Sequence, residues 1–312
     1  MISKHNNKRI LFFLATEKGY QVFSRLINDG RKDYIAGVVS FHEVGVQKDY
    51  FSDLKNVCMN QGICFFEWKT IKDNLISLIH DKSITSCVAI SWRYLLPLSI
   101  NEYLEDDLII FHDSLLPKYR GFAPLVTAMI NGDKNVGASV LYATEQADCG
   151  EIIMQEAFEI DETENIQNAI EKMSKIYAEL ACKLVDGIIG NTLVSSPQVE
   201  TNATYSIWRD EDDYWIDWKW SAEKIQRFVK AVGYPYKGAK TMVGENTIRI
   251  LEASIIDDID FAIRMPGKIW MIDKGIPTIV CGKGMIRIDK AIDENGCIHM
   301  FTRLRDRMVG GV

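Results

Sequence analysis

The sequence predicts an α/β protein whose larger N-terminal domain has a mostly parallel sheet with helices on both faces. Two observations support this fold class. In the first half of the chain, short apolar runs alternate with amphipathic stretches, the pattern of strand–helix–strand units. A polar, aperiodic stretch at residues 192–207 interrupts that pattern, and mainly short strands are predicted beyond it. We therefore expect two domains, residues 1–200 and residues 201–312.

The first domain is predicted from its strands and the helices between them. Apolar runs predict strands at residues 9–15, 34–40, 63–67, 86–91 and 108–112, and helices at 21–28, 54–61 and 71–80. Such a Rossmann-like sheet binds ligands beyond the carboxyl ends of its strands. Residues 91–93 and 112–114 are thus expected on the ligand-facing rim. The segment after the first strand, ATEKGYQVF, lacks G-x-G-x-x-G, so the dinucleotide fingerprint is not supported.

The second half begins with one long helix and ends in a β-rich region. An apolar stripe predicts a helix over residues 164–189, which Gly190 and Asn191 end. Ser221 is a typical N-cap for a shorter helix that ends at Gly233. Strands are then predicted at residues 247–253, 266–272, 278–281 and 285–288. Residues 201–312 are therefore expected to form a smaller, OB-like domain.

Composition favours a cytoplasmic enzyme over several other classes. The net charge of −7 argues against a partner recognised through its phosphate backbone. The seven cysteines are scattered with no C-x-x-C pair, so neither a zinc site nor a redox pair is indicated, and we expect no metal. The N-terminus resembles a first strand rather than a signal peptide. No apolar run is long enough to predict a membrane span.

Two residues stand out as candidates for acid–base chemistry. His112 ends an apolar strand, where a histidine can transfer protons, although a lone histidine is more often structural. Asp148 follows another predicted strand, residues 138–142, in a turn. A carboxylate beside a histidine can orient its ring and favour its charged form. Together they form a candidate catalytic pair.

The residues around this pair resemble the formyltransferase family that uses 10-formyltetrahydrofolate. The resemblance is ordered over about forty residues and carried by His112-x-Ser114-Leu115-Leu116-Pro117, Tyr119-Arg120-Gly121, Asn131-Gly132 and Ala147-Asp148-x-Gly150. It implies an N-formyltransferase in which His112 handles the proton of the attacking amine and Asp148 raises the basicity of His112. It also implies that the folate donor lies against Tyr94, Leu95, Leu96, Leu116, Thr144, Glu145, Gln146 and Ala147.

Two positions depart from the family pattern. The family has an asparagine two residues before the histidine, where this chain has Ile110, which cannot donate a hydrogen bond to an oxyanion. Asp113 stands where small residues are usual. A slow enzyme, a dead one or a site with a substitute donor are all open. We expect the last, with His112 holding the oxyanion and Asp113 or Asp148 keeping it charged.

The C-terminal part resembles enzymes that act on nucleotide-linked amino sugars for glycan biosynthesis. The resemblance rests on Ile216-Asp217-Trp218 and on Tyr234-Pro235-Tyr236-Lys237-Gly238-Ala239. Arg93, Arg120, Arg209 and Tyr236 are candidates for binding this acceptor. The tryptophans at 208–220 are expected to pack in the interior or to stack on a base or sugar ring.

The sequence also bears on other partners and on alternative functions. The tRNA-acting class carries a basic loop after the second strand, whereas residues 41–53 here are not basic, so no nucleic acid is expected. The alternatives are a methionyl-tRNA formyltransferase or an impaired folate- or nucleotide-binding homologue. No membrane partner is expected, and a homodimer is left open.

Overall fold

The computed structural model describes residues 8–44 and 48–311, which form two compact units. Unit 1 comprises the described residues of Met1–Gly121, together with Val136–Phe158 and Glu171–Tyr205. Unit 2 comprises Phe122–Asn135, Glu159–Ile170 and Ser206–Val312. Both units are therefore discontinuous in sequence, and the domain boundary near residue 200 stays a prediction.

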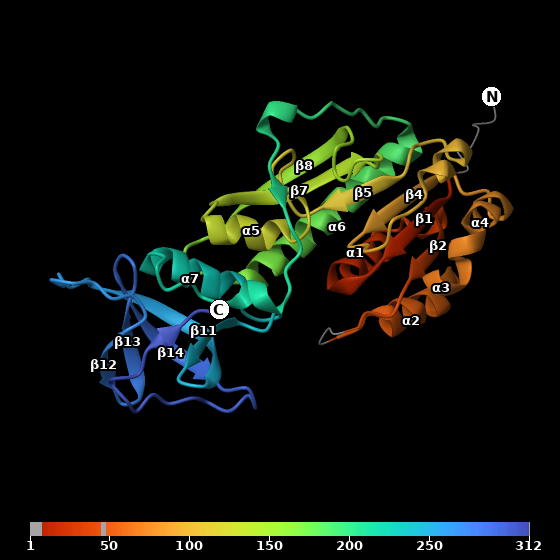
Figure 1. Ribbon diagram of the computed structural model, residues 1–312. Helices are drawn as coiled ribbons and strands as arrows, with labels where there is room; N and C mark the ends of the chain where they lie inside the picture. Colours follow the sequence, from red (N-terminus) through yellow and green to blue (C-terminus); the bar gives the residue numbers. More distant parts are fainter. Residues whose placement is uncertain (1–7, 45–47, 312) are drawn as a thin grey trace, which may run out of the picture. The chain divides into compact units, whose positions relative to one another are not determined.

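Unit 1 is built on a seven-stranded sheet of order β3-β2-β1-β4-β5-β7-β8 (Figure 1). Its strands are β1 (Ile10–Leu14), β2 (Ile35–Ser40), β3 (Cys64–Glu67), β4 (Ser86–Ile90), β5 (Ile109–His112), β7 (Asn135–Tyr142) and β8 (Ile152–Glu159). The pairings from β3 through β5 are parallel, and β7 pairs antiparallel with β5. The predicted mostly parallel sheet is confirmed, but β8 was missed because its alternating burial gives no continuous apolar run.

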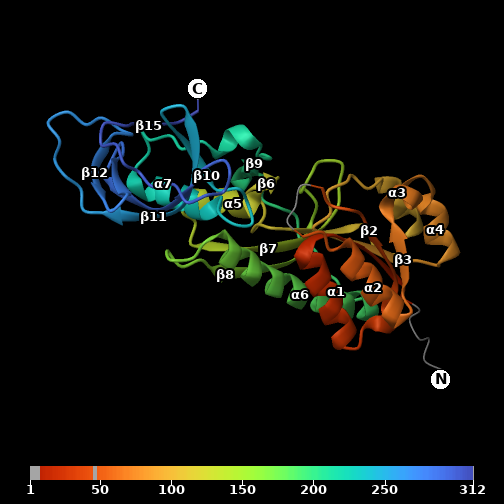
Figure 2. The same ribbon diagram turned by 90° about the horizontal axis from the view of Figure 1, so that it is seen from below.

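Helices cover both faces of this sheet, as predicted (Figure 2). They are α1 (Thr16–Asn28), α2 (Phe51–Gln61), α3 (Trp68–Ile71), α4 (Leu75–Asp81) and α6 (Ile166–Gly190). Helices α1 and α6 share one face, while α3 and α4 lie on the other. Helix α1 begins five residues before the predicted residue 21, and the helix predicted at 71–80 is divided by a 3₁₀ turn at Lys72–Asn74.

Unit 2 combines two helices with an antiparallel sheet. The helices α5 (Pro124–Asn131) and α7 (Ala222–Ala231) pack side by side. The sheet has the order β12-β13-β14-β11-β10-β15 and contains β10 (Ala239–Val243), β11 (Asn246–Ile256), β12 (Ile269–Asp273), β13 (Ile276–Val280), β14 (Met285–Ile292) and β15 (Met308–Val309). This sheet confirms the predicted β-rich region. Ser221 caps α7 as predicted, because its hydroxyl accepts from the Lys224 amide at 3.3 Å.

The structure also has two short strands, β6 (Arg120–Gly121) and β9 (Tyr205–Ser206), which pair with each other. Within the described residues no helix is long and apolar enough to cross a membrane.

Candidate active site

His112 is the last residue of β5, and each nitrogen of its ring lies near an oxygen of another residue. The residue is 7% exposed. Its Nε2 lies 2.8 Å from the Tyr119 carbonyl oxygen, and its Nδ1 lies 3.5 Å from Asp148 Oδ1. A carbonyl oxygen only accepts hydrogen bonds, so Nε2 carries the hydrogen of this bond. Nδ1 is therefore the nitrogen whose lone pair can take a further proton, beside a carboxylate that stabilises the resulting positive charge.

Asp148 reaches His112 from a loop with an unusual backbone. Strand β7 is antiparallel to β5 and ends beside the start of β5, since Tyr142 pairs with Ile109. The loop that follows brings Asp148 back to His112 with φ +58°, a left-handed conformation that is uncommon for a residue with a side chain. Its Oδ2 accepts a hydrogen bond of 2.8 Å from the Gly121 amide, and its carbonyl accepts one of 2.7 Å from Gln198 Nε2. The side chain and the backbone of Asp148 are thus each held by a group outside its own loop.

Glycine is required in the same loop two residues later. A Cβ at Gly150 would lie 1.8 Å from the Tyr142 carbonyl oxygen, closer than any real contact. The loop can fold tightly against the end of β7 only because this position has no side chain. This steric requirement explains why the motif has glycine at position 150 in this chain.

Ile110 lies on the same face of β5 as His112, because alternate side chains of a strand point the same way. It is partly buried against a large apolar cluster that includes Phe13, Phe41 and Trp68. Its apolar side chain therefore fits its surroundings.

The Asp113 side chain is bound by groups other than His112, although the His112 charge also helps to lower the pKa of Asp113. Phe111 and Asp113 point to the opposite face of the sheet, where the Phe111 ring lies 5.1 Å from that of Tyr177. There the Asp113 carboxylate forms an ion pair with Lys18 of α1 and accepts a hydrogen bond from the Tyr177 hydroxyl of α6. The carboxylate that faces His112 is Asp148.

The electrostatics of this second cluster are those of a largely but not fully buried ion pair. Burial alone would raise the pKa of Asp113, but the Lys18 ammonium and the bonds from Lys18 and Tyr177 hold that pKa below its ordinary value. Burial, reinforced by the Asp113 charge, raises the pKa of the Tyr177 hydroxyl well above its usual range. Sequence reasoning missed Lys18 and Tyr177, because the only signal was a lysine in the first turn after β1.

Most residues predicted to contact the donor lie on two loops, at residues 94–96 and 144–147. Leu116 lies outside both loops. Tyr94 is 48% and Leu95 96% exposed, whereas Leu96 packs against the apolar cluster. Residues 144–147 are exposed, and the Thr144 hydroxyl donates to the Gln146 carbonyl at 2.8 Å. Leu116 is buried, at 4% exposure. Beside the first loop, Ser91 Oγ and Trp92 Nε1 are buried and make no hydrogen bond within the described chain.

The basic residues predicted to bind an acceptor have different surroundings. Arg93 forms an ion pair of 2.8 Å with Glu43, whose side chain is only 2% exposed. Burial raises the pKa of the Glu43 carboxyl, although the Arg93 charge opposes that shift. Arg120 is 1% exposed and its guanidinium bonds Gln198 and Glu200. These partners point to a structural role, and substrate binding by Arg120 stays a prediction.

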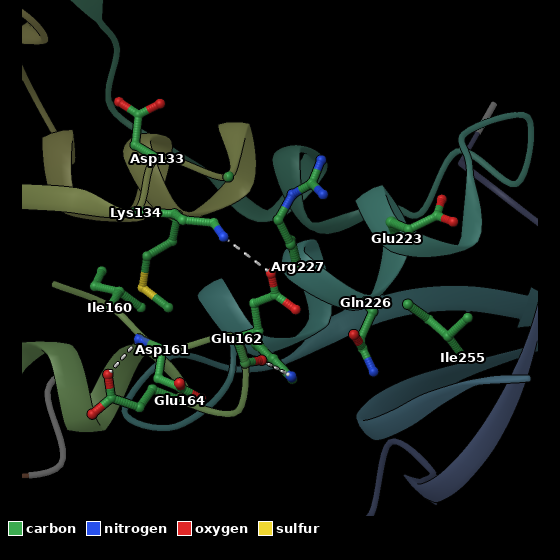
Figure 3. Close-up of a pocket in the computed structure, with 13 residues that line it drawn as sticks. Asp133, Lys134, Ile160, Asp161, Glu162, Glu164, Glu223, Gln226, Arg227 and Ile255 are labelled. Carbon is green, nitrogen blue, oxygen red and sulfur yellow. Dashed lines mark hydrogen bonds and ion pairs between the residues drawn. The ribbon is translucent and has the colours of Figure 1, made fainter.

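Two further candidates and one well-defined cavity lie in unit 2. Arg209 has a buried Nε without a hydrogen bond in the described chain, and Tyr236 is 38% exposed. A cavity of about 290 Å³ lies between α5 and α7 and is lined by mixed charges, including Lys134, Glu162 and Arg227 (Figure 3). It contains none of the predicted site residues. Among the described residues no cluster of metal-ligating side chains occurs.

Comparison with known families gives two matches along this chain. The family described as formyl transferase matches residues 9–183, and the formyl transferase C-terminal domain matches residues 209–300.

Among curated relatives, the chain is similar to methionyl-tRNA formyltransferases. It is 32% identical to that of Staphylococcus epidermidis over 65% of this chain, and the match spans only about two thirds (66%) of the relative's length. It is 26% identical to that of Caldanaerobacter subterraneus over 95% of each protein.

Solved structures with the same fold include N-formyltransferases crystallised with a nucleotide or a nucleotide-linked sugar. The sugar 3N-formyl transferase WlaRD, crystallised with dTDP and 5-N-formyl-THF, has a TM-score of 0.67 at 16% identity, covering 93% of this chain and 99% of the other. An N-formyltransferase from Helicobacter canadensis, in complex with folinic acid and dTDP-3-aminofucose, has a TM-score of 0.70 at 16% identity, with 90% and 98% covered.

Proposed function

This chain belongs to the formyl transferase family, and from that premise we propose that it moves the formyl group of 10-formyltetrahydrofolate onto the amine of a nucleotide-linked amino sugar. The family membership confirms the resemblance that the motif around His112 indicated. The donor and the acceptor are parts of the proposal.

The observation that carries the proposal is the contact between His112 and Asp148. The hydrogen on Nε2 is directed at the Tyr119 carbonyl, so Nδ1 takes the proton that the amine must lose when it attacks. Asp148, 3.5 Å away, stabilises the imidazolium that forms. The same imidazolium supplies positive charge toward the developing oxyanion, which offsets the donor that Ile110 cannot provide.

The surroundings of the site fit a flat polar donor such as a folate ring. Ser91 Oγ and Trp92 Nε1 are buried polar atoms without hydrogen bonds in the described chain, and such groups are costly unless a ligand bonds them. The exposed loops at residues 94–96 and 144–147 offer backbone donors and acceptors nearby in the same unit. When bound, the donor supplies the activated formyl group, and these residues would hold it.

The acceptor is inferred from the charge of the segment after β2. Within its described residues, His42 pairs with Asp49 at 2.7 Å and Lys48 with Asp53 at 3.5 Å, so the basic groups are neutralised locally. Such a segment gives little attraction to the phosphates of a tRNA. A small acceptor, whose charge is confined to one diphosphate, is less dependent on a broad basic surface.

A second candidate function is methionyl-tRNA formyltransferase. It is favoured by the curated relatives, since the protein of Caldanaerobacter subterraneus matches 95% of this chain. This candidate would require that another surface supply the basic contacts to the acceptor arm.

Direct competition between acceptors tests the proposal. The purified protein would be given 10-formyltetrahydrofolate with UDP-, dTDP- or GDP-linked amino sugars in parallel with charged initiator methionyl-tRNA, and kcat/KM measured for each. We expect turnover of at least one nucleotide-linked amino sugar and a lower kcat/KM for tRNA. The matched control is the same sugar without its nucleotide. A higher kcat/KM for tRNA would establish the second candidate instead.

A further inference from the structure

The polar stretch after α6, at residues 192–207, makes hydrogen bonds to the two loops that contain Asp148 and Tyr119. Its residues 196–204 belong to unit 1. Ser196 exchanges two backbone hydrogen bonds with Ile152, of 2.8 and 2.9 Å, just beyond the Asp148 loop. Farther along, Thr204 accepts from the Arg120 amide at 2.9 Å and donates to the Pro117 carbonyl at 3.2 Å. The stretch therefore spans from the Asp148 loop to the loop that contains Tyr119.

Gln198 is the residue of this stretch that reaches Asp148. Its Nε2 donates to the carbonyl oxygens of Asp148 and Gly150, at 2.7 and 2.8 Å. Its Oε1 accepts from Nε and Nη2 of Arg120, at 3.1 and 2.8 Å. Both ends of one amide are therefore occupied, and the assignment of its oxygen and nitrogen follows from partners that can only accept or only donate.

Arg120 in turn holds Gln198 in place. Its guanidinium is almost fully buried and forms a two-pronged ion pair with Glu200, with distances of 2.9 and 2.6 Å. Planar pairing of this kind fixes orientation as well as charge. Because Arg120 also precedes Gly121, whose amide binds the Asp148 carboxylate, one residue is linked to Asp148 by two routes.

The loop needs such support because its conformation is unfavourable by itself. Asp148 has φ +58°, and a residue with a side chain stays in that region only when its surroundings hold it there. Its own loop contributes few restraints, since residues 144–147 are exposed. The Gln198 bond to the Asp148 carbonyl acts directly on the strained residue.

We propose that Gln198 is a positioning residue that keeps Asp148 facing His112, and that residues 196–204 are a brace joining the Asp148 loop to the Tyr119 loop. This inference rests on the proposed function for its kinetic readout. The same brace holds the carbonyl that orients His112 Nε2, because the Tyr119 amide donates to the Thr204 hydroxyl at 2.9 Å.

Two substitutions of Gln198 distinguish the contribution of its amide donor from that of its amide acceptor. Gln198→Leu removes both, whereas Gln198→Glu keeps an acceptor for Arg120 but places negative charge against two carbonyl oxygens. We expect both variants to lower kcat about 10- to 100-fold, the range that a displacement near 1 Å causes, with the KM for the formyl donor little changed. Ser195→Ala is the matched control: its hydroxyl binds the exposed Glu151, and the variant should keep wild-type kcat.

A double-mutant cycle distinguishes positioning from general support of the fold. If Gln198 acts through Asp148, Gln198→Leu should cost little further kcat in an Asp148→Asn background. Rates would be normalised to folded enzyme by circular dichroism. Full additivity of the two losses, or a Gln198→Leu variant with wild-type kcat and only a lower Tm, would overturn the proposal.

An NMR readout keeps this test independent of the acceptor. The ¹H and ¹⁵N chemical shifts of the His112 imidazole would be compared in the wild type, in Gln198→Leu and in Ser195→Ala. A displaced Asp148 changes the charge next to Nδ1, so these shifts should move in Gln198→Leu, while Ser195→Ala matches the wild type. Unchanged imidazole shifts in Gln198→Leu would contradict the inference. Lack of turnover by the wild type on every acceptor would instead count against the proposed function.

Discussion

Two aspartates lie beside His112, and the structure gives them different surroundings. Asp148 faces the imidazole at 3.5 Å from a loop with a left-handed backbone, and its other oxygen is held by the Gly121 amide. Asp113 is adjacent in sequence but points to the other face of the sheet, where Lys18 and Tyr177 bind it. Sequence proximity therefore misleads here. Strand alternation accounts for the direction of Asp113, and we propose catalysis for Asp148 and packing of α1 and α6 on the sheet for Asp113.

The largest effect is expected from the loss of the His112 imidazole. We expect His112→Ala to lower kcat at least about 10²- to 10⁴-fold, because the proton acceptor is removed. The variant should still bind the folate donor, as measured by calorimetry. Near wild-type turnover would show that the pair has another role.

Next in size is the loss of the buried charge at Asp113. In Asp113→Asn, Lys18 loses its anionic partner while its side chain remains only 14% exposed. We expect the free energy of unfolding to fall by about 1–3 kcal/mol, below the range for fully buried pairs because both side chains are partly accessible. Urea denaturation measures this. Tyr177→Phe, which keeps the ring and the ion pair, is the milder control.

Ile110→Asn tests the face of β5 on which His112 lies, opposite to the face that carries Asp113. The new amide would lie against the apolar cluster that Ile110 now contacts. We expect kcat to stay flat or fall, with about 1–3 kcal/mol lost from the free energy of unfolding through an unsatisfied polar group. A tenfold or larger gain in kcat at saturating donor and acceptor would show instead that the site merely lacks an oxyanion donor.

The smallest effect is expected at an exposed carboxylate in unit 2. Lys237, through a hydrogen bond, and Arg249 lower the pKa of Glu211 from its ordinary value of 4.5 to about 2. Since this pKa is depressed, the pairing stabilises the folded state above pH 4.5 and is lost as the pH falls toward 2. The side chain is 45% exposed, so we expect less than about 1 kcal/mol between wild type and Glu211→Gln at pH 7. Thermal unfolding from pH 7 to 2.5 should show this difference shrinking with falling pH.

The sequence predicted the parallel part of the sheet well because buried strands are continuous apolar runs. Strand β8 escaped detection, since its residues alternate in burial, and α5 lay inside the stretch that was interpreted by motif alone. Helix α1 was placed late because Thr16, with φ +63°, begins the helix directly after β1 without a recognisable cap.

The candidate site was predicted in its residues but not in its geometry. The motif named His112 and Asp148, yet β7 is antiparallel to β5, so the rule of carboxyl strand ends does not bring Asp148 to His112. That contact depends on a loop held by Gln198 from a segment without periodicity. Hydrogen bonds between residues fifty positions apart leave no pattern in a single sequence.

The most direct test compares Asp148→Asn with Asp113→Asn in one formyl-transfer assay under single-turnover conditions. Rates would be taken per folded molecule, with saturating donor. We predict that Asp148→Asn lowers the rate about 10²-fold or more, because the charge that stabilises the imidazolium is gone. Asp113→Asn should keep a rate within a few-fold of wild type. A larger loss of rate in Asp113→Asn than in Asp148→Asn would contradict the division of roles.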